Sequence, residues 1–229
     1  MLAIRCSHTM TQTEIKFVVV GHHTRCHHAE HLAWSLCAHL LIDEGQHGAN
    51  WNHRRAIEWA SQQDCRVVIM EDDALLVGGF IEKVSAWLDR FPDDLLSFYL
   101  GTGRPPQYQL EVATKLIDSD QRQTDYIRMS RLIHGVCYSI PRHRITDLLT
   151  RWDSAKPADY AVGDACGGDV IYPCYSLVDH ADSATVERHP DKEQRTERRR
   201  AWRLDASQNT QSMPEARLCQ HYDRRIGLL

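Results

Sequence analysis

The sequence has no long apolar stretch and no excess of positive charge. Its apolar runs are far shorter than the roughly 20 residues that a membrane-spanning helix needs, so no membrane span is predicted. It does not open with the basic and apolar segments of a secretion signal, which favours a soluble, cytoplasmic protein. With 27 Lys and Arg against 31 Asp and Glu, the net charge of −4 disfavours bulk electrostatic binding to nucleic acid.

Motifs of several common protein classes are also missing. There is neither a G-x-G-x-x-G turn nor a G-x-x-x-x-G-K-[ST] loop, which argues against dinucleotide enzymes and P-loop ATPases. The eight cysteines form no C-x-x-C pair, and we expect them to be reduced and mostly buried. A zinc site is conceivable where histidines gather beside Cys26, but exposed helix histidines are favoured because a full ligand set is lacking. These histidines are His22, His23, His27, His28 and His31.

The most informative feature that is present is an apolar run that ends in carboxylates. Residues 66–70 read R-V-V-I-M, and Glu71, Asp72 and Asp73 follow directly. A continuous β-branched run is typical of a strand buried on both faces, and the carboxyl ends of such strands border ligand-binding crevices. Crowded carboxylates repel one another unless a cation neutralises them. The run therefore predicts a divalent metal site, with a solvated acidic turn as the alternative.

The order of the predicted elements indicates an α/β fold: a largely parallel central sheet flanked by helices, in a single domain. Strands are expected at 15–20, 66–70, 95–100, 126–129, 136–140 and 170–172. Helices are expected at 27–41, 50–61, 80–90, 141–152 and 158–166. Glycines and prolines predict a loop at 101–106, and residues 1–14 are expected to form a flexible extension.

A series of segments between about residues 15 and 203 resembles one family of enzymes. In order they are G-H-H-T-R at 21–25, N-H-R-R-A at 52–56, M-E-D-D-A at 70–74, Y-L-G-T-G-R-P-P-Q at 99–107, H-G-V at 134–136 and S-L-V-D-H-A-D at 176–182. The E-D-D-A segment resembles the metal-binding motif of GT-A glycosyltransferases. The whole series is similar to small glycosyltransferases of actinobacterial phages and their hosts. The chain departs from the pattern at 174–175, where Trp-Pro is expected, and at 164–166, where a Trp is usual.

This resemblance implies a GT-A-like, Rossmann-like catalytic domain over 15–186 and a basic tail, 187–229, that packs on or near the active site. It implies transfer of a sugar from a nucleotide-sugar donor, with a UDP-sugar favoured, to a hydroxyl acceptor. If the protein is phage-encoded and acts in the host cytoplasm, the acceptor is a virion protein, a glycan or a modified DNA base. The alternatives are a metal-dependent phosphodiesterase or nuclease, and a non-catalytic sugar-binding relic of the same fold.

The resemblance also implies a metal and a donor site. Mn²⁺ or Mg²⁺ is the expected cofactor, with Asp73 and His180 as direct ligands; for His180 a loop histidine is the alternative. Asp72 is expected to bind the metal through water or to contact the ribose, and Glu71 to point back into the fold or to support the ligands. The other donor-binding candidates are Gly21, His22, Thr24, Arg25, Asn52, His53 and Arg55. A helix-start salt bridge is the alternative for Arg25, and surface helix positions are the alternative for the last three.

Asp159 is expected to be the catalytic carboxylate, with Asp164 as its competitor. It would act as the base in an inverting reaction or stabilise the sugar in a retaining one, and a helix N-cap is the alternative. Arg104, His134 and Arg199 are expected on the acceptor side. The arginine cluster at 198–200 would close over the diphosphate or face a polyanionic acceptor, with a solvated helix face as the alternative.

Overall fold

The computed structural model describes residues 14–181 and 198–206. Alternating side chains along β1 (Ile15–His22) and β3 (Arg66–Glu71) divide its core into two layers. One layer receives Val18, Val20, Val67 and Ile69, and the other receives Phe17, Val19, Val68 and Met70. Successive strand residues point to opposite faces, so a run that is apolar at every position needs cover on both sides.

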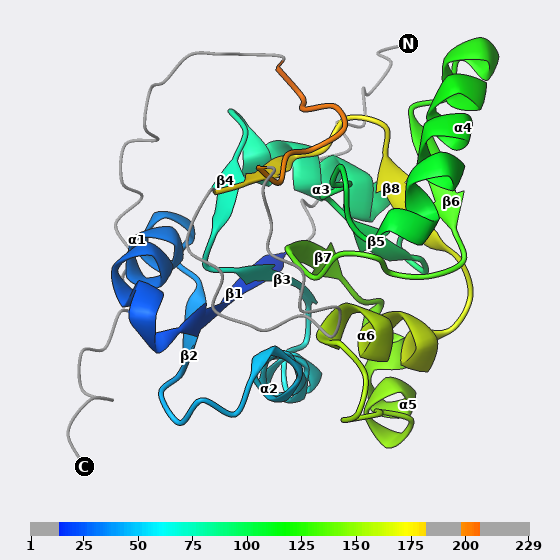
Figure 1. The fold of residues 1–229 in the computed structure, drawn as a ribbon. Coiled ribbons are helices and arrows are strands. Elements are labelled where there is room, and N and C mark those ends of the chain that lie inside the picture. The colour runs from blue at the N-terminus through cyan, green and yellow to red at the C-terminus, as the bar shows by residue number, and fades with distance from the viewer. Residues whose placement is uncertain (1–13, 182–197, 207–229) are drawn as a thin grey trace, which may run out of the picture.

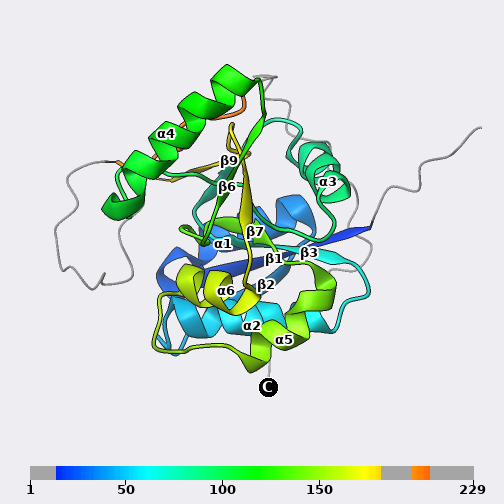
Figure 2. The same cartoon turned by 90° about the vertical axis from the view of Figure 1, so that its right-hand side faces the viewer.

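Helices provide that cover. The first layer lies under α2 (Ala49–Ser61), α5 (Ile145–Thr150) and α6 (Ala158–Cys166), which Figure 2 shows together on one side of the sheet. The second layer lies under α1 (Cys26–Leu36) and α3 (Phe80–Arg90). The long helix α4 (Pro106–Arg122) stands at the far end of the molecule, beside β6 (Tyr126–Met129) (Figure 1).

The central sheet has seven strands in the order β2-β1-β3-β7-β5-β8-β6. The strands not yet placed are β2 (His39–Asp43), β5 (Leu95–Ser97), β7 (Cys137–Ser139) and β8 (Val170–Pro173). β1 pairs in parallel with β2 and β3, and β5 with β8, whereas β7 and β6 are antiparallel to their neighbours. Five strands therefore share one direction and two oppose it, which confirms the predicted mostly parallel α/β sheet.

The strand order places a crevice at the carboxyl ends of β1 and β3. From β1 the chain passes to β2 on one side, and it then crosses to β3 on the other side of β1. The point where the strand order reverses is where open α/β sheets leave room for a ligand. A separate antiparallel pair, β4 (Ala74–Leu76) and β9 (Val178–His180), begins directly after β3.

Three of the expectations about the helices differ from the structure. The helix expected at 27–41 ends at Leu36, because Cys37 adopts a left-handed conformation (φ 51°) and the chain continues as β2. The apolar residues at 40–42 continued the helical spacing by chance. Helix α4 was not predicted at all, since Leu110 and Ile117 are exposed and blur its pattern, while its buried residues are few. The helix expected at 141–152 is shorter and begins as a 3-10 turn at 142–144.

Several further expectations concern the termini and the cysteines. The predicted extension at 1–14 lies almost wholly outside the described residues, and the tail at 187–229 is described only at 198–206. Cys37 is disulfide-bonded, contrary to the expectation of reduced thiols. The remaining described cysteines are free, namely Cys26, Cys65, Cys137, Cys166 and Cys174.

Within the described part of the chain no helix is both long and apolar enough to span a bilayer.

Candidate metal centre and active site

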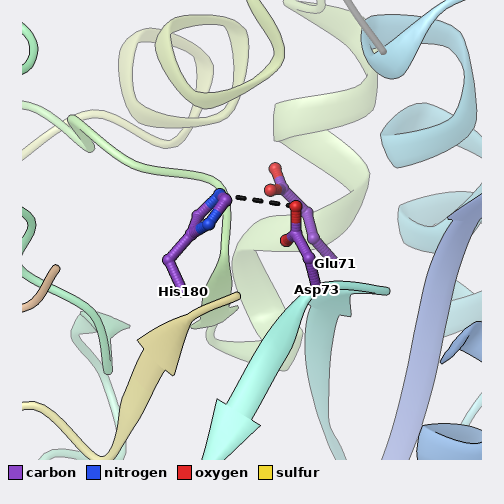
Figure 3. A group of neighbouring side chains, drawn as sticks. All are labelled: Glu71, Asp73 and His180. Atoms are coloured by element: carbon purple, nitrogen blue, oxygen red, sulfur yellow. Dashed lines mark ion pairs between the residues drawn. The ribbon is translucent and has the colours of Figure 1, made fainter. Parts of the chain in front are cut away.

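The small β4–β9 pair brings His180 to the acidic motif. Its register sets His180 opposite Ala74, and the Ala181 N–H donates to the carbonyl of Asp73 at 2.8 Å. His180 Nε2 then lies 3.4 Å from Asp73 Oδ2, with both side chains almost fully buried (Figure 3). Two residues far apart in the sequence are thus held side by side by backbone pairing.

Glu71 is the third member of this group. Ligand atoms of Glu71, Asp73 and His180 lie within 4.8 Å of one another (Figure 3). No other set of three or more acidic, histidine or cysteine side chains in the described ranges is arranged to hold a metal, the α1 histidines included. The sequence predicted Asp72 in this place and Glu71 behind it. The difference arises in the turn at residues 72–73 between β3 and β4, where Asp73 meets His180 while Asp72 accepts the His22 N–H at the end of β1.

The hydrogen bonding of the group fits a bound cation. His180 Nδ1 faces the carbonyl oxygen of Ala181 at 2.6 Å, so it carries the hydrogen and leaves a lone pair on Nε2. That nitrogen and Asp73 Oδ1 are both buried without a hydrogen-bond partner. Nε2 faces Asp73 Oδ2, which accepts from Arg25, so Nε2 and Asp73 Oδ1 are the two buried acceptors that a cation could still satisfy. Two carboxylates and an imidazole are a ligand set that suits Mn²⁺, and Mg²⁺ less well.

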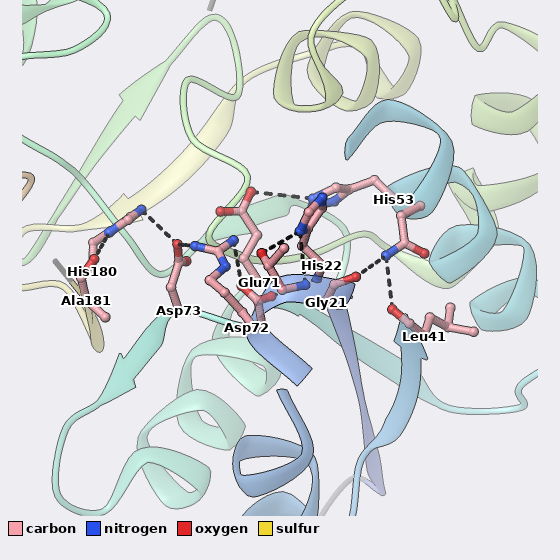
Figure 4. A network of polar contacts seen from close by, with 12 residues as sticks. Gly21, His22, Leu41, His53, Glu71, Asp72, Asp73, His180 and Ala181 are labelled. Carbon is pink, nitrogen blue, oxygen red and sulfur yellow. Dashed lines mark hydrogen bonds and ion pairs between the residues drawn. The ribbon is translucent and has the colours of Figure 1, made fainter. Parts of the chain in front are cut away.

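Asp72 faces the end of β1. It accepts the His22 N–H at 2.8 Å (Figure 4). Arg25 bridges Asp72 Oδ1 at 2.7 Å and Asp73 Oδ2 at 2.5 Å. Burial raises the pKa of Asp72 to about 6; the His22 N–H and Arg25 oppose this rise, and the neighbouring Asp73 and Glu71 carboxylates add to it. Arg25 therefore makes the helix-start salt bridge that was its alternative role, and it makes this bridge with the acidic motif itself.

The donor-site candidates on α2 are not surface residues. Asn52 is buried, and its amide donates to the carbonyls of Gly21 at 3.2 Å and Leu41 at 2.9 Å, which ties the ends of β1 and β2 together. His53 is also buried and lies beside Glu71. The half-buried Arg55 donates to the Ile42 carbonyl and lies over the Trp51 ring, 4.5 Å from its centroid.

At the start of the first helix the two remaining donor candidates contact each other. His22 Nδ1 lies 2.8 Å from Thr24 Oγ1 at the rim of the crevice, and the Thr24 N–H also points to this ring. Burial, together with the neighbouring His23 and Arg25, lowers the pKa of His22. At neutral pH this ring is therefore an uncharged hydrogen-bonding group beside the acidic motif.

The two candidate catalytic carboxylates have different surroundings. Asp159 is half-buried in the first turn of α6, where Pro157 is the N-cap, so Asp159 is not the cap. Burial raises the pKa of Asp159 to about 6, and the charge of Glu71 adds to the rise. Asp164 instead pairs with both nitrogens of the Arg131 fork at 2.7 and 3.0 Å and with Lys156 at 2.9 Å. Only Asp159 is left with a carboxylate that can exchange a proton near neutral pH.

On the expected acceptor side, His134 has a structural bond. Its Nε2 accepts the Gly101 N–H at 3.0 Å, and burial lowers the pKa of His134 to about 3, so the ring is neutral. Arg104 lies in the neighbouring loop, where Gln109 bonds the backbone at Gly101, Gly103 and Arg104.

The described part of the basic tail, 198–206, lies beside the site. The Thr102 N–H donates to the Arg200 carbonyl, and the Ala201 N–H donates to Asp179 Oδ1, both at 2.8 Å. Burial alone would raise the pKa of Glu71, yet interaction with His53 and nearby positive charge, that of Arg199 included, lower it to about 2. Glu71 is therefore ionised at neutral pH, with the half-buried Arg199 near it.

Sequence reasoning missed two features of the site. One is a cavity of about 160 Å³ that Asp72 and Asp73 line together with the exposed α1 residues His28 and His31. The other is Tyr138 on β7, whose hydroxyl lies 2.9 Å from His53 Nδ1. A tyrosine within a buried strand was the available signal, since its hydroxyl needs a partner there.

Comparison with known proteins gives no further guide to the chemistry of this site. No family model matches the chain, and neither does any curated protein. The function therefore has to be argued from the geometry of the site and the chemistry of its residues.

Proposed function

We propose that this protein is a metal-dependent glycosyltransferase of the GT-A type that uses a nucleotide-sugar donor, with a UDP-sugar favoured. One observation carries the proposal: the Glu71–Asp73–His180 group lies at the crevice beside β1 and β3 and has unpaired buried ligand atoms. When bound there, Mn²⁺ or Mg²⁺ would neutralise charge on the diphosphate leaving group. The acceptor is a hydroxyl of a virion protein, a glycan or a modified DNA base.

The residues around the group have matching tasks in such a reaction. The bond from the sugar's anomeric carbon to the diphosphate oxygen breaks, and a bond to the acceptor oxygen forms. Arg25 can fork onto diphosphate oxygens from its place beside Asp72, and Arg199 adds positive charge near Glu71. Asp159 takes the proton of the acceptor hydroxyl in an inverting enzyme, or stabilises the sugar in a retaining one.

The two alternatives fit the site less well. Phosphodiesterases and nucleases with paired metals need more ligands than the single three-residue group in the described part of the chain. A sugar-binding relic has no use for a buried imidazole and two carboxylates directed at one point. The transferase proposal accounts for both the ligand group and the proton-exchanging Asp159.

The test measures nucleoside diphosphate release from UDP-, GDP- and TDP-sugars with Mn²⁺ and no acceptor. We expect slow hydrolysis of one donor, lost with EDTA and at least 100-fold slower in Asp73→Ala. Asp93→Ala, which removes a carboxylate that is 78% exposed, is the matched control and should retain the rate. No release from any donor, together with no thermal shift from nucleotide plus Mn²⁺, would refute the proposal; cleavage of a simple phosphodiester would favour the alternative.

A further inference from the structure

His53 lies beside Glu71 of the Glu71–Asp73–His180 group, between β3 and β7 of the core. It projects from α2, is 1% exposed, and has Tyr138 of β7 on one side and Glu71 of β3 on the other. Its Nδ1 lies 2.9 Å from the Tyr138 hydroxyl. Its Nε2 lies 3.4 Å from Glu71 Oε1 (Figure 4). The imidazole therefore lies between the buried Tyr138 hydroxyl and Glu71. Glu71 is the member of the Glu71–Asp73–His180 group that the sequence did not predict as a direct ligand.

The partners of the ring determine which nitrogen carries the hydrogen. An ionised carboxylate only accepts hydrogen bonds, so the nitrogen facing Glu71 must be the donor. Nδ1 of the neutral ring then accepts, and the Tyr138 hydroxyl donates to it. The separation from Glu71 is slightly long for a hydrogen bond, and Nε2 has no other hydrogen-bond partner. A small shift of the Glu71 carboxylate toward the ring would complete the chain of donors.

The backbone on the other side leaves Glu71 little freedom. A Cβ placed on Gly135 would lie 2.9 Å from Glu71 Oε1 and 3.4 Å from His53 Cε1, so a side chain there would displace the Glu71 carboxylate. The Glu71 N–H donates to the Val136 carbonyl at 2.9 Å, which holds the main chain of the ligand. The carboxylate is thus confined between an imidazole and the backbone of residue 135.

We propose that His53, oriented by Tyr138, is a positioning residue that holds Glu71 as the third ligand of the divalent cation. Groups that hydrogen-bond to a metal ligand fix its orientation, and their loss commonly weakens metal binding 10- to 100-fold. The inference rests on the metal site of the proposed function and is independent of what is transferred. His53 thus has a role different from the donor contact that the sequence suggested.

Two isosteric substitutions separate the two sides of the ring. A glutamine amide reaches the position of Nε2, whereas an asparagine amide reaches only that of Nδ1. Mn²⁺ affinity is measured on the nucleotide-free full chain from the electron paramagnetic resonance signal of free Mn²⁺. We expect His53→Gln to stay within about threefold of the wild type and His53→Asn to bind at least 10-fold more weakly.

A double-mutant cycle shows whether His53 acts through Glu71. In a Glu71→Ala background, itself weaker for Mn²⁺, His53→Asn should cause no further loss. Equal weakening by Gln and Asn, a full additional loss in the Glu71→Ala background, or no loss in either variant would overturn the proposal. Metal-free melting temperatures of the two single variants should match, which excludes a purely structural effect.

The outcome can be separated from that of the proposed function. If no donor sugar is hydrolysed but the Mn²⁺ pattern holds, the positioning role stands and the transferase proposal fails. If the wild type binds no Mn²⁺ at all, the metal site and this inference both fail.

Discussion

At the scale of single residues, surroundings and not residue type distinguish the two candidate catalytic aspartates. Asp159 and Asp164 lie on the same short helix, α6. The first has its pKa raised to about 6 by burial, while the second is held by the charges of Arg131 and Lys156. A general base must be free to accept a proton near the working pH, and Asp164 is not.

We therefore predict that Asp159→Asn slows donor turnover by at least about 100-fold, the usual contribution of a general base. Asp164→Asn should retain the rate within a few-fold and lose at most about 1 kcal/mol of stability, because its ion pairs are partly exposed. Since the base must be deprotonated, the wild-type rate should rise with pH until about 6 and then level off. Nucleoside diphosphate release measured from pH 5 to 8 checks all three points, and equal losses in the two variants would contradict them.

At the scale of elements, the position of α6 depends on a close backbone approach. A Cβ on Gly163 would lie 2.7 Å from the Leu132 backbone nitrogen and 3.1 Å from its Cβ. The helix that carries Asp159 is thus packed directly against the chain that leads into the H-G-V segment. A larger residue here would push the helix, and Asp159 with it, away from the Leu132 backbone.

Gly163→Ala should accordingly destabilise the protein by about 1–3 kcal/mol through overpacking. In an unhindered helix the same change would stabilise by about 1 kcal/mol, so the sign is diagnostic. Thr114→Ala on the exposed side of α4 is the control for helix propensity and should stabilise slightly. Urea unfolding measures the free energy of unfolding of both variants. An increase for Gly163→Ala would show that α6 is not closely packed against Leu132.

At the scale of the whole molecule, the Glu71–Asp73–His180 group joins two sheets. Glu71 ends β3 of the central sheet, whereas His180 ends β9 of the small one. A cation held by both would stabilise the folded state, by about 2.7 kcal/mol at a concentration one hundred times its dissociation constant.

Mn²⁺ should therefore raise the melting temperature of the wild type, and EDTA should reverse the rise. His180→Ala should abolish the shift because it removes a ligand from one of the two sheets. His31→Ala, which removes an exposed histidine at the rim of the neighbouring cavity, should retain it. Differential scanning fluorimetry with and without Mn²⁺ measures the shift. If His31→Ala loses the shift and His180→Ala retains it, the cation binds at α1 instead.

Local pattern was enough to predict much of the fold. The helices Phe80–Arg90 and Ala158–Cys166 and the strand Tyr126–Met129 have the predicted bounds, since their apolar spacing and flanking turns are encoded within a few residues. The strand ending in carboxylates was recognisable for the same reason. The pattern failed at β2 and α4, where burial depends on which neighbours pack against each residue.

By itself, therefore, the sequence determined the fold class and the segments that carry the polar chemistry. Only the tertiary structure decided which side chains meet: Glu71 rather than Asp72 beside His180, salt bridges around Asp164, and Tyr138 behind His53. The reason is physical. Secondary structure follows from interactions along a short stretch of chain, whereas a site is formed by pairing between strands and helices distant in the sequence, and a one-residue change in register redirects every side chain.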